Sequence, residues 1–220
     1  MKSYEQFVNE QSHQGSTILM RHARSKHNVQ ETTDLDSEIT SFGRKQCRVV
    51  GNFARTSDEI NLDGYTFVVS PFYRTLLTLD LFLKAAEIEN PEVIVNPIVG
   101  ENLNTGVKEN ENVRVIDRSK TFKDWNWDLY HEACDDGSYR QKPETHEQLL
   151  ERMKDACSSF RGKTFVVSHA YPVIVMSSVL EGNHDDVPVW DYSINNCSLT
   201  WIENGKRKWY GRNLHHELED

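Results

Sequence analysis

Four side chains in this sequence are suited to polar chemistry, and each lies near the end of an apolar segment. Arg21 and His22 directly follow the apolar residues 17–20, and His169 closely follows another apolar run. Arg74 comes shortly after a third. A guanidinium group can bind two phosphate oxygens at once. A neutral imidazole can act as a nucleophile or a base. Such groups together are suited to binding and transferring a phosphoryl group.

Three apolar segments precede these polar residues. Residues 17–20, 65–69 and 164–167 are short and rich in β-branched side chains, which is typical of buried strands. The carboxyl ends of parallel strands meet at one edge of a sheet, where ligands bind. We therefore expect His22 and His169 to face each other across one anion-sized site.

Helical patterns alternate with the strands. The strand signals continue at 93–95, and Asn204-Gly205 predicts a hairpin between 197–202 and 206–210. Helices are expected at 41–55 after Thr40 or Ser41, at 71–86 with Ser70 as N-cap and Pro71 in the first position, at 143–160, and at 172–180. This order predicts an α/β fold, a three-layer sandwich with a mostly parallel central sheet and helices on both faces.

Residues 100–142 have no clear period and combine charged residues with aromatic ones. So long a segment is expected to form a cap or lid insertion within a single domain of residues 1–220. Two readings of Trp125, Trp127 and Tyr130 stay open. They form the core of the lid, or they line the site and favour a substrate with a planar part.

Composition limits the possible partners. The chain has 220 residues, of which 37% are hydrophobic and 27% charged, and its net charge is −9. This charge disfavours binding to nucleic-acid backbones, although basic residues gather within positions 21–27. We expect no membrane span, because no run approaches about 18 apolar residues. Residues 1–15 lack the apolar core of a signal peptide, so a cytoplasmic location is expected.

The remaining cysteines and histidines are expected to have no chemical role. The four cysteines are far apart, which indicates neither a zinc site nor a disulfide framework. Cys47 and Cys157 are expected in helix cores. Surface positions are predicted for His13, His27, His131, His146, His184, His215 and His216.

Several of these residues recur in one family pattern. The chain resembles the histidine phosphatase superfamily, which has the phosphoglycerate-mutase-like fold. The resemblance extends from Thr17 to Trp201. Matching residues of the first motif are Arg21, His22, Ser25 and Asn28; those of the later motifs are Ser70, Pro71, Arg74, Thr78, Ser168 and His169; looser matches are Asp36, Ile39, Thr40, Gly43, Gln46, Glu144, Arg152 and Asn196. Ala23 and Ala170 replace the two motif glycines.

The resemblance implies a metal-independent phosphatase of small phosphate esters, with no cofactor and a phosphohistidine intermediate on His22. It implies that Arg21, Arg74 and His169 bind the phosphate oxygens. Asn28 and Ser25 are expected to assist. The expected acid is Glu101, at the entry to the cap. The alternative carboxylates are Glu109, Glu111, Asp34 and Asp36.

Two other functions stay open. One is a phosphotransferase of the phosphoglycerate mutase type, although such mutases carry Trp-Asn where this chain has Lys26-His27-Asn28. The other is a module that binds a phosphorylated ligand without turnover, which the loss of two glycines favours. The presence of both histidines argues against it.

Overall fold

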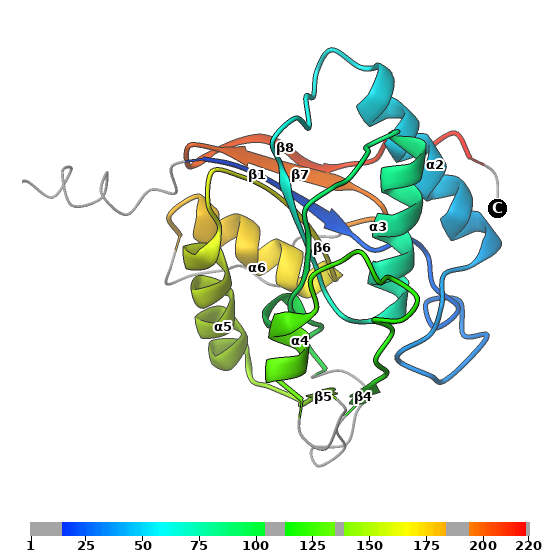
Figure 1. Cartoon of the computed structure of the whole chain (residues 1–220). Helices are drawn as coiled ribbons and strands as arrows, with labels where there is room; N and C mark the ends of the chain where they lie inside the picture. The colour runs from blue at the N-terminus through cyan, green and yellow to red at the C-terminus, as the bar shows by residue number, and fades with distance from the viewer. Residues whose placement is uncertain (1–14, 104–112, 135–138, 184–193, 219–220) are drawn as a thin grey trace, which may run out of the picture.

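The centre of the molecule is a six-stranded sheet. The computed structural model describes residues 15–103, 113–134, 139–183 and 194–218. The sheet order is β3-β2-β6-β1-β7-β8 (Figure 1). The strands are β1 (Ser16–Arg21), β2 (Thr66–Val69), β3 (Val93–Val95), β6 (Lys163–Ser168), β7 (Leu199–Glu203) and β8 (Lys206–Arg212). β3, β2, β6 and β1 pair in parallel, whereas β7 pairs antiparallel with both β1 and β8, so the prediction of a mostly parallel sheet is confirmed.

The register of the parallel strands brings their ends together. β2 and β6 share the sequence Thr-Phe-Val-Val and lie side by side, with Val69 opposite Val167. On the other side of β6, Arg21 lies opposite Ser168. The polar residues that follow β1, β2 and β6 therefore begin at the same level of the sheet.

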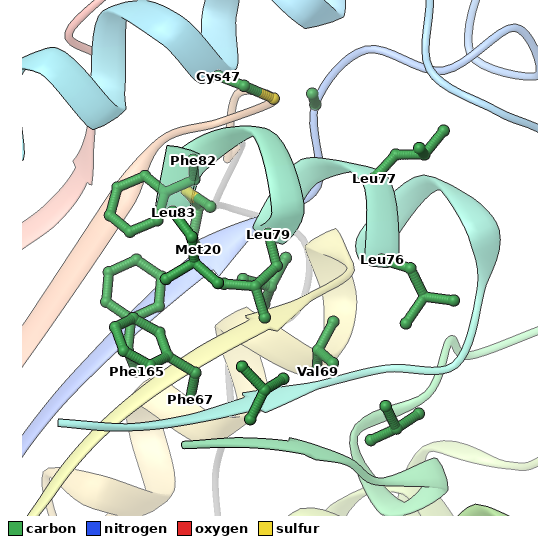
Figure 2. Close-up of a cluster of buried hydrophobic side chains, with 14 of the residues drawn as sticks. Met20, Cys47, Phe67, Val69, Leu76, Leu77, Leu79, Phe82, Leu83 and Phe165 are labelled. Atoms are coloured by element: carbon green, nitrogen blue, oxygen red, sulfur yellow. The ribbon is translucent and has the colours of Figure 1, made fainter. Parts of the chain in front are cut away.

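Helices cover both faces of the sheet, which confirms the three-layer prediction (Figure 1). On one face are α2 (Ser41–Thr56) and α3 (Tyr73–Ala85), and on the other are α5 (His146–Ser159) and α6 (Ala170–Leu180). Within β1, Met20 packs toward α2 and α3, as Figure 2 shows, while Leu19 packs toward α5 and α6. Strands buried on both faces need continuous apolar sequence, which explains the apolar runs.

Two helices begin later than the sequence predicts. The N-cap of α3 is Phe72, and its side chain makes no capping bond, so the prediction of Ser70 as N-cap is wrong. The prediction that α5 begins at Pro143 is also wrong, because Thr145 caps this helix in a capping box with Gln148. For α2, the prediction of Thr40 as N-cap is confirmed by its bond from the amide of Gly43.

The described residues between β3 and α5 form a small subassembly at one end of the molecule (Figure 1). Its elements are the 3₁₀ helix η1 (Pro97–Val99), β4 (Val113–Val115), α4 (Asp128–Glu132) and β5 (Tyr139–Gln141), and β4 pairs with β5. Asn126 hydrogen-bonds to the edge of β3. The rings of Trp127 and Tyr130 are buried and in edge contact at 5.2 Å. Trp127 and Tyr130 thus form a local core within this segment, as in the first of the two interpretations that the sequence left open.

The C-terminal segment contacts the core. The prediction that His215 is a surface histidine is wrong, because this residue is only 7% exposed. Its Nε2 lies 2.6 Å from the carbonyl of Asn196. His131 and His216 are exposed as predicted, whereas His13 and His184 lie outside the described residues.

The predictions on buried cysteines and on membrane spans can be compared with the described residues. Cys47 and Cys157 are buried in helices, as expected. No helix in the described ranges is long and apolar enough to cross a membrane.

Candidate active site

Two histidine rings are in edge contact at the ends of β1 and β6. His22 follows β1 and His169 follows β6, and their ring centroids are 5.3 Å apart. The backbone amide of His22 donates to the carbonyl of Ser168, which fixes the two strand ends relative to each other. Both side chains are almost wholly buried, at 2% and 0% exposure. Two residues 147 positions apart in the sequence thus share one buried site.

Arg74 contacts both rings. It is in the first turn of α3, and its Nε donates to His22 Nε2 at 3.2 Å. Its Nη2 donates to His169 Nδ1 at 3.0 Å and to Glu101 Oε2 at 3.1 Å. Its Nη1 donates to the carbonyl of Leu35. One guanidinium group therefore connects both histidines and the carboxylate.

These bonds show which ring nitrogen of His22 carries the lone pair and which carries the proton. An arginine only donates, so His22 Nε2 must accept and carries a lone pair. At the other side of the ring, Nδ1 lies 2.8 Å from the carbonyl of Ala23, to which it donates its proton. The neutral tautomer therefore presents Nε2 to Arg74 and to the centre of the site.

Burial keeps both histidines neutral. The pKa of His22 is well below its usual 6.5 because of burial and the positive charges of Arg74, His169 and Arg21. Burial lowers the pKa of His169 to about 4, even though the negative charge of Glu101 opposes this change. At neutral pH both rings retain the lone pair that a nucleophile or acceptor needs.

Ser70 supports His169 from the other side of its ring. The Ser70 hydroxyl lies 2.8 Å from His169 Nε2, and both side chains are fully buried. A hydroxyl can donate or accept, so this contact is compatible with either protonation of Nε2. The sequence predicted Ser70 at the start of the helix, and it gave no sign of this contact between residues 70 and 169.

Glu101 points its carboxylate into the same cluster. Oε2 lies 3.2 Å from His169 Nδ1, and Oε1 accepts from the amide of Asn102 at 3.0 Å. Burial alone would raise the pKa of this carboxyl, but the charges of protonated His169 and of Arg74 lower it to about 2. Glu101 is therefore ionised in the free protein.

The other candidate acids lie elsewhere. Asp36 is buried, but it accepts from the amides of Tyr73 and Ile116 and pairs with Arg118, so its oxygens are occupied in joining segments of the chain. Asp34 is exposed. Glu109 and Glu111 lie outside the described residues.

Arg21 provides a second guanidinium with a free donor. Its Nη1 donates to the carbonyl of Ile194 at 2.5 Å. Its Nε is buried and has no hydrogen-bond partner among the described residues. Burial also lowers the pKa of this side chain, although the group stays charged. A buried donor without a partner is costly, and an anion would satisfy it.

Ser25 and Asn28 shape the loop that follows His22. The amide of Ser25 donates to Asn28 Oδ1 at 3.1 Å, and the amide of Asn28 donates to Ser25 Oγ at 3.3 Å. Asn196 joins this loop to the site, because its Nδ2 donates to the carbonyl of His22 at 2.9 Å. The predicted contact of Ser25 and Asn28 with phosphate stays a prediction.

The two alanines at motif glycine positions have ordinary backbones. Among the described non-glycine residues with positive φ, neither Ala23 nor Ala170 occurs, and Ala170 is the first residue of α6. The Ala23 amide donates to Thr78 at 2.9 Å. The absence of glycine therefore strains neither position.

The site favours an anion over a cation. Ligand atoms of His22, Glu101 and His169 lie within 4.8 Å of one another, a spacing that would suit a metal ion. However, Arg74 donates to all three side chains and Arg21 adds a second positive charge. Two buried guanidinium groups oppose a cation and attract a phosphate-sized anion.

Comparisons of the fold agree with this geometry. The ecdysone phosphate phosphatase of Bombyx mori, solved with tungstate, has a TM-score of 0.61 at 15% identity and covers 90% of this chain and 93% of its own. A phosphoserine phosphatase from Entamoeba histolytica has a TM-score of 0.58 at 17% identity, covering 92% and 99%. At these identities the likeness shows a shared fold.

A third structure is the mycobacterial glucosyl-3-phosphoglycerate phosphatase solved with vanadate, with a TM-score of 0.52 at 16% identity, covering 85% of this chain and 90% of its own. No curated protein matches the sequence. The family model of the histidine phosphatase superfamily, branch 1, matches residues 17–215, which is nearly the whole chain. This chain therefore belongs to the histidine phosphatase superfamily.

Proposed function

We propose that the protein is a metal-independent phosphatase that hydrolyses a small phosphate ester through a phosphohistidine on His22. The observation that carries this proposal is the hydrogen bond from Arg74 to His22 Nε2 at 3.2 Å. This bond supports the proposal, because it holds a neutral imidazole and a guanidinium group together at one buried point. Catalysis of phosphoryl transfer depends mainly on such positioning and charge stabilisation.

Phosphate binding would rearrange the bonds of Arg74. In the free protein, Arg74 and His169 contact the Glu101 carboxylate. A phosphate group offers oxygens to Arg74, His169 and the unpartnered Nε of Arg21. We place Asn28 and Ser25 at the rim of this phosphate site, on the loop after His22.

The same exchange prepares Glu101 as the acid. Its low pKa depends on Arg74 and His169. When phosphate takes over these partners and adds negative charge nearby, the pKa of Glu101 rises and the carboxyl group can hold a proton. A general acid needs that proton to protonate the leaving oxygen.

The proposed reaction then has two balanced steps. His22 Nε2 forms a bond to phosphorus while the bond from phosphorus to the ester oxygen breaks, and Glu101 gives its proton to that oxygen, which leaves as an alcohol. Glu101 next accepts a proton from water, whose oxygen attacks phosphorus. The N–P bond breaks and releases phosphate and neutral His22. The carbonyl of Ala23 holds the Nδ1 proton throughout.

The test is His22→Ala, assayed with 4-nitrophenyl phosphate and a panel of phosphorylated metabolites. We expect turnover to fall by at least three orders of magnitude, together with loss of acid-labile phosphate on the protein, because the covalent route is removed. His216→Ala, at an exposed histidine, is the matched control and should keep both signals. Turnover that persists in His22→Ala would refute the assignment.

A further inference from the structure

We propose that Arg152 is a positioning residue that holds the Glu101 acid against the leaving oxygen. The inference rests on the proposed function, because it assigns a task to a residue outside the phosphate-binding cluster. Arg152 lies in α5, on the face of the sheet opposite α3, which carries Arg74. It acts through the backbone that carries Glu101.

Side chains from two other elements hold four consecutive carbonyls of this backbone. Arg152 Nη1 donates to the carbonyls of Ile98 and Gly100 at 2.6 and 3.1 Å, and Nη2 donates to that of Glu101 at 3.3 Å. The remaining carbonyl, of Val99, accepts from Ser168 Oγ at 2.6 Å. Helix η1 ends at Val99, and the described residues 100–103 that follow it belong to no helix or strand. The position of Glu101 thus depends on these side chains.

Arg152 is itself held rigidly. Its Nε donates to Glu144 Oε2 at 2.9 Å, and Nη2 donates to Glu144 Oε1. The two side chains are only 17% and 11% exposed. This two-point pairing of planar groups fixes the orientation of the guanidinium, which lysine cannot reproduce.

Close packing also limits movement on the side of β5. A Cβ atom on Gly100 would lie 2.4 Å from Oε1 of Gln141, so the backbone passes directly against that buried side chain. Glu101 is therefore held between α5 and β5. Its carboxylate can exchange partners when phosphate binds without the backbone moving. A displacement of about 1 Å at a reacting group can cost a hundredfold in rate.

The experiment uses the dependence of rate on the leaving group. Phenyl phosphate and 4-nitrophenyl phosphate are similar in shape, but phenolate is the more basic leaving group and needs protonation more. We would measure kcat/KM for both esters in the wild type, Arg152→Gln, Arg152→Lys, Glu101→Gln and the double variant Arg152→Gln/Glu101→Gln. The matched control is Arg161→Gln, because among the described residues the side chain of Arg161 bonds only to the nearby carbonyls of Ser158 and Phe160.

If Arg152 positions the acid, Arg152→Gln raises the ratio of nitrophenyl to phenyl kcat/KM by about tenfold or more, as Glu101→Gln does, since acid catalysis supplies at least about a hundredfold. The double variant then shows no further rise. Arg152→Lys, which keeps the charge, also raises this ratio, but by a smaller factor. If Arg152→Gln does not fold, Arg152→Lys alone provides the test. Arg161→Gln keeps the wild-type ratio.

Equal losses on both esters in Arg152→Gln or Arg152→Lys would overturn the inference, because a structural or purely electrostatic role lowers both rates alike. A wild-type ratio in the folded variants would overturn it as well. Failure of the proposed function gives a different result, namely persistent turnover in His22→Ala.

Discussion

At the scale of single residues, one arginine is the shared hydrogen-bond partner of three side chains in the site. Arg74 is 4% exposed and donates to His22, His169 and Glu101. Because it only donates, it selects the tautomer of His22. Ser70 performs a related task for His169, since its hydroxyl holds Nε2. The two histidines are thus held in fixed orientations by neighbouring side chains, and under the proposed mechanism this is the preorganisation that phosphoryl transfer requires.

A serine variant tests this orientation. We expect Ser70→Ala to lower kcat/KM by roughly tenfold and the free energy of unfolding by about 1–2 kcal/mol, because a buried hydrogen bond is lost and His169 is freed to turn. Ser177→Ala is the matched control, since within the part of the chain that the structure describes this buried hydroxyl bonds only to the carbonyl of Ile174 in its own helix. Steady-state kinetics and urea unfolding measure the two effects. A variant with unchanged kcat/KM would contradict the role of Ser70.

At the scale of elements, one buried carboxylate joins three segments around Arg74. Asp36 accepts from the amide of Tyr73 at 2.7 Å, at the start of α3, and from the amide of Ile116 at 3.2 Å, just after β4. It also pairs with Arg118 at 2.7 Å, whose guanidinium lies over the ring of Tyr73. The loop before α2, the start of α3 and the residues after β4 are thus fixed together, and the neighbouring Leu35 carbonyl holds Arg74.

Removing this charge should loosen all three segments. We expect Asp36→Asn to lower the free energy of unfolding by about 2–4 kcal/mol, because a mostly buried arginine loses its charged partner. The activity should fall as well, since the loop that holds Arg74 is less well fixed. Asp34→Asn provides the control: Asp34 is exposed, and asparagine keeps its bond to the amide of Asp36. Equal urea midpoints for the two variants would show that the carboxylate has no joining role.

At the scale of the whole molecule, the folded protein buries two uncharged histidines in its interior. The pKa of His22 lies well below 6.5 and that of His169 is about 4, in both cases chiefly because of burial. In the unfolded chain these rings would take up protons near pH 6.5. The unfolded state therefore binds more protons than the folded state below that pH, and stability must fall as the solution becomes more acidic.

This difference predicts the pH dependence of stability. The contribution of the neutral histidines should be complete above pH 6.5 and should be lost progressively toward pH 4, with a loss on the order of 3 kcal/mol for His169 alone. Glu101, whose pKa is about 2, adds a loss of the same sign between about pH 4.5 and 2. Urea unfolding from pH 7.5 to 4.5 measures the slope. A His169→Gln variant should show a shallower slope, and an equal slope would contradict this account.

The sequence by itself determined the layers of the fold and the residues that end its strands. Residues 17–20, 65–69 and 164–167 are apolar on both strand faces, which required a sheet covered by helices on each side. Because parallel strand ends meet at one edge, the same pattern anticipated that His22 and His169 would lie close together. These properties are local or follow from a general rule of topology, so they are readable without coordinates.

Only the tertiary structure decided the partners of the polar side chains. Ser70 bonds to His169 instead of capping a helix, and His215 is buried against Asn196 instead of lying on the surface. Arg152 bonds to the backbone carbonyls of Ile98, Gly100 and Glu101, about fifty positions earlier in the chain. The physical reason is that a hydrogen bond depends on direction and on distances of a few tenths of an ångström, and sequence spacing carries neither for residues brought together by folding.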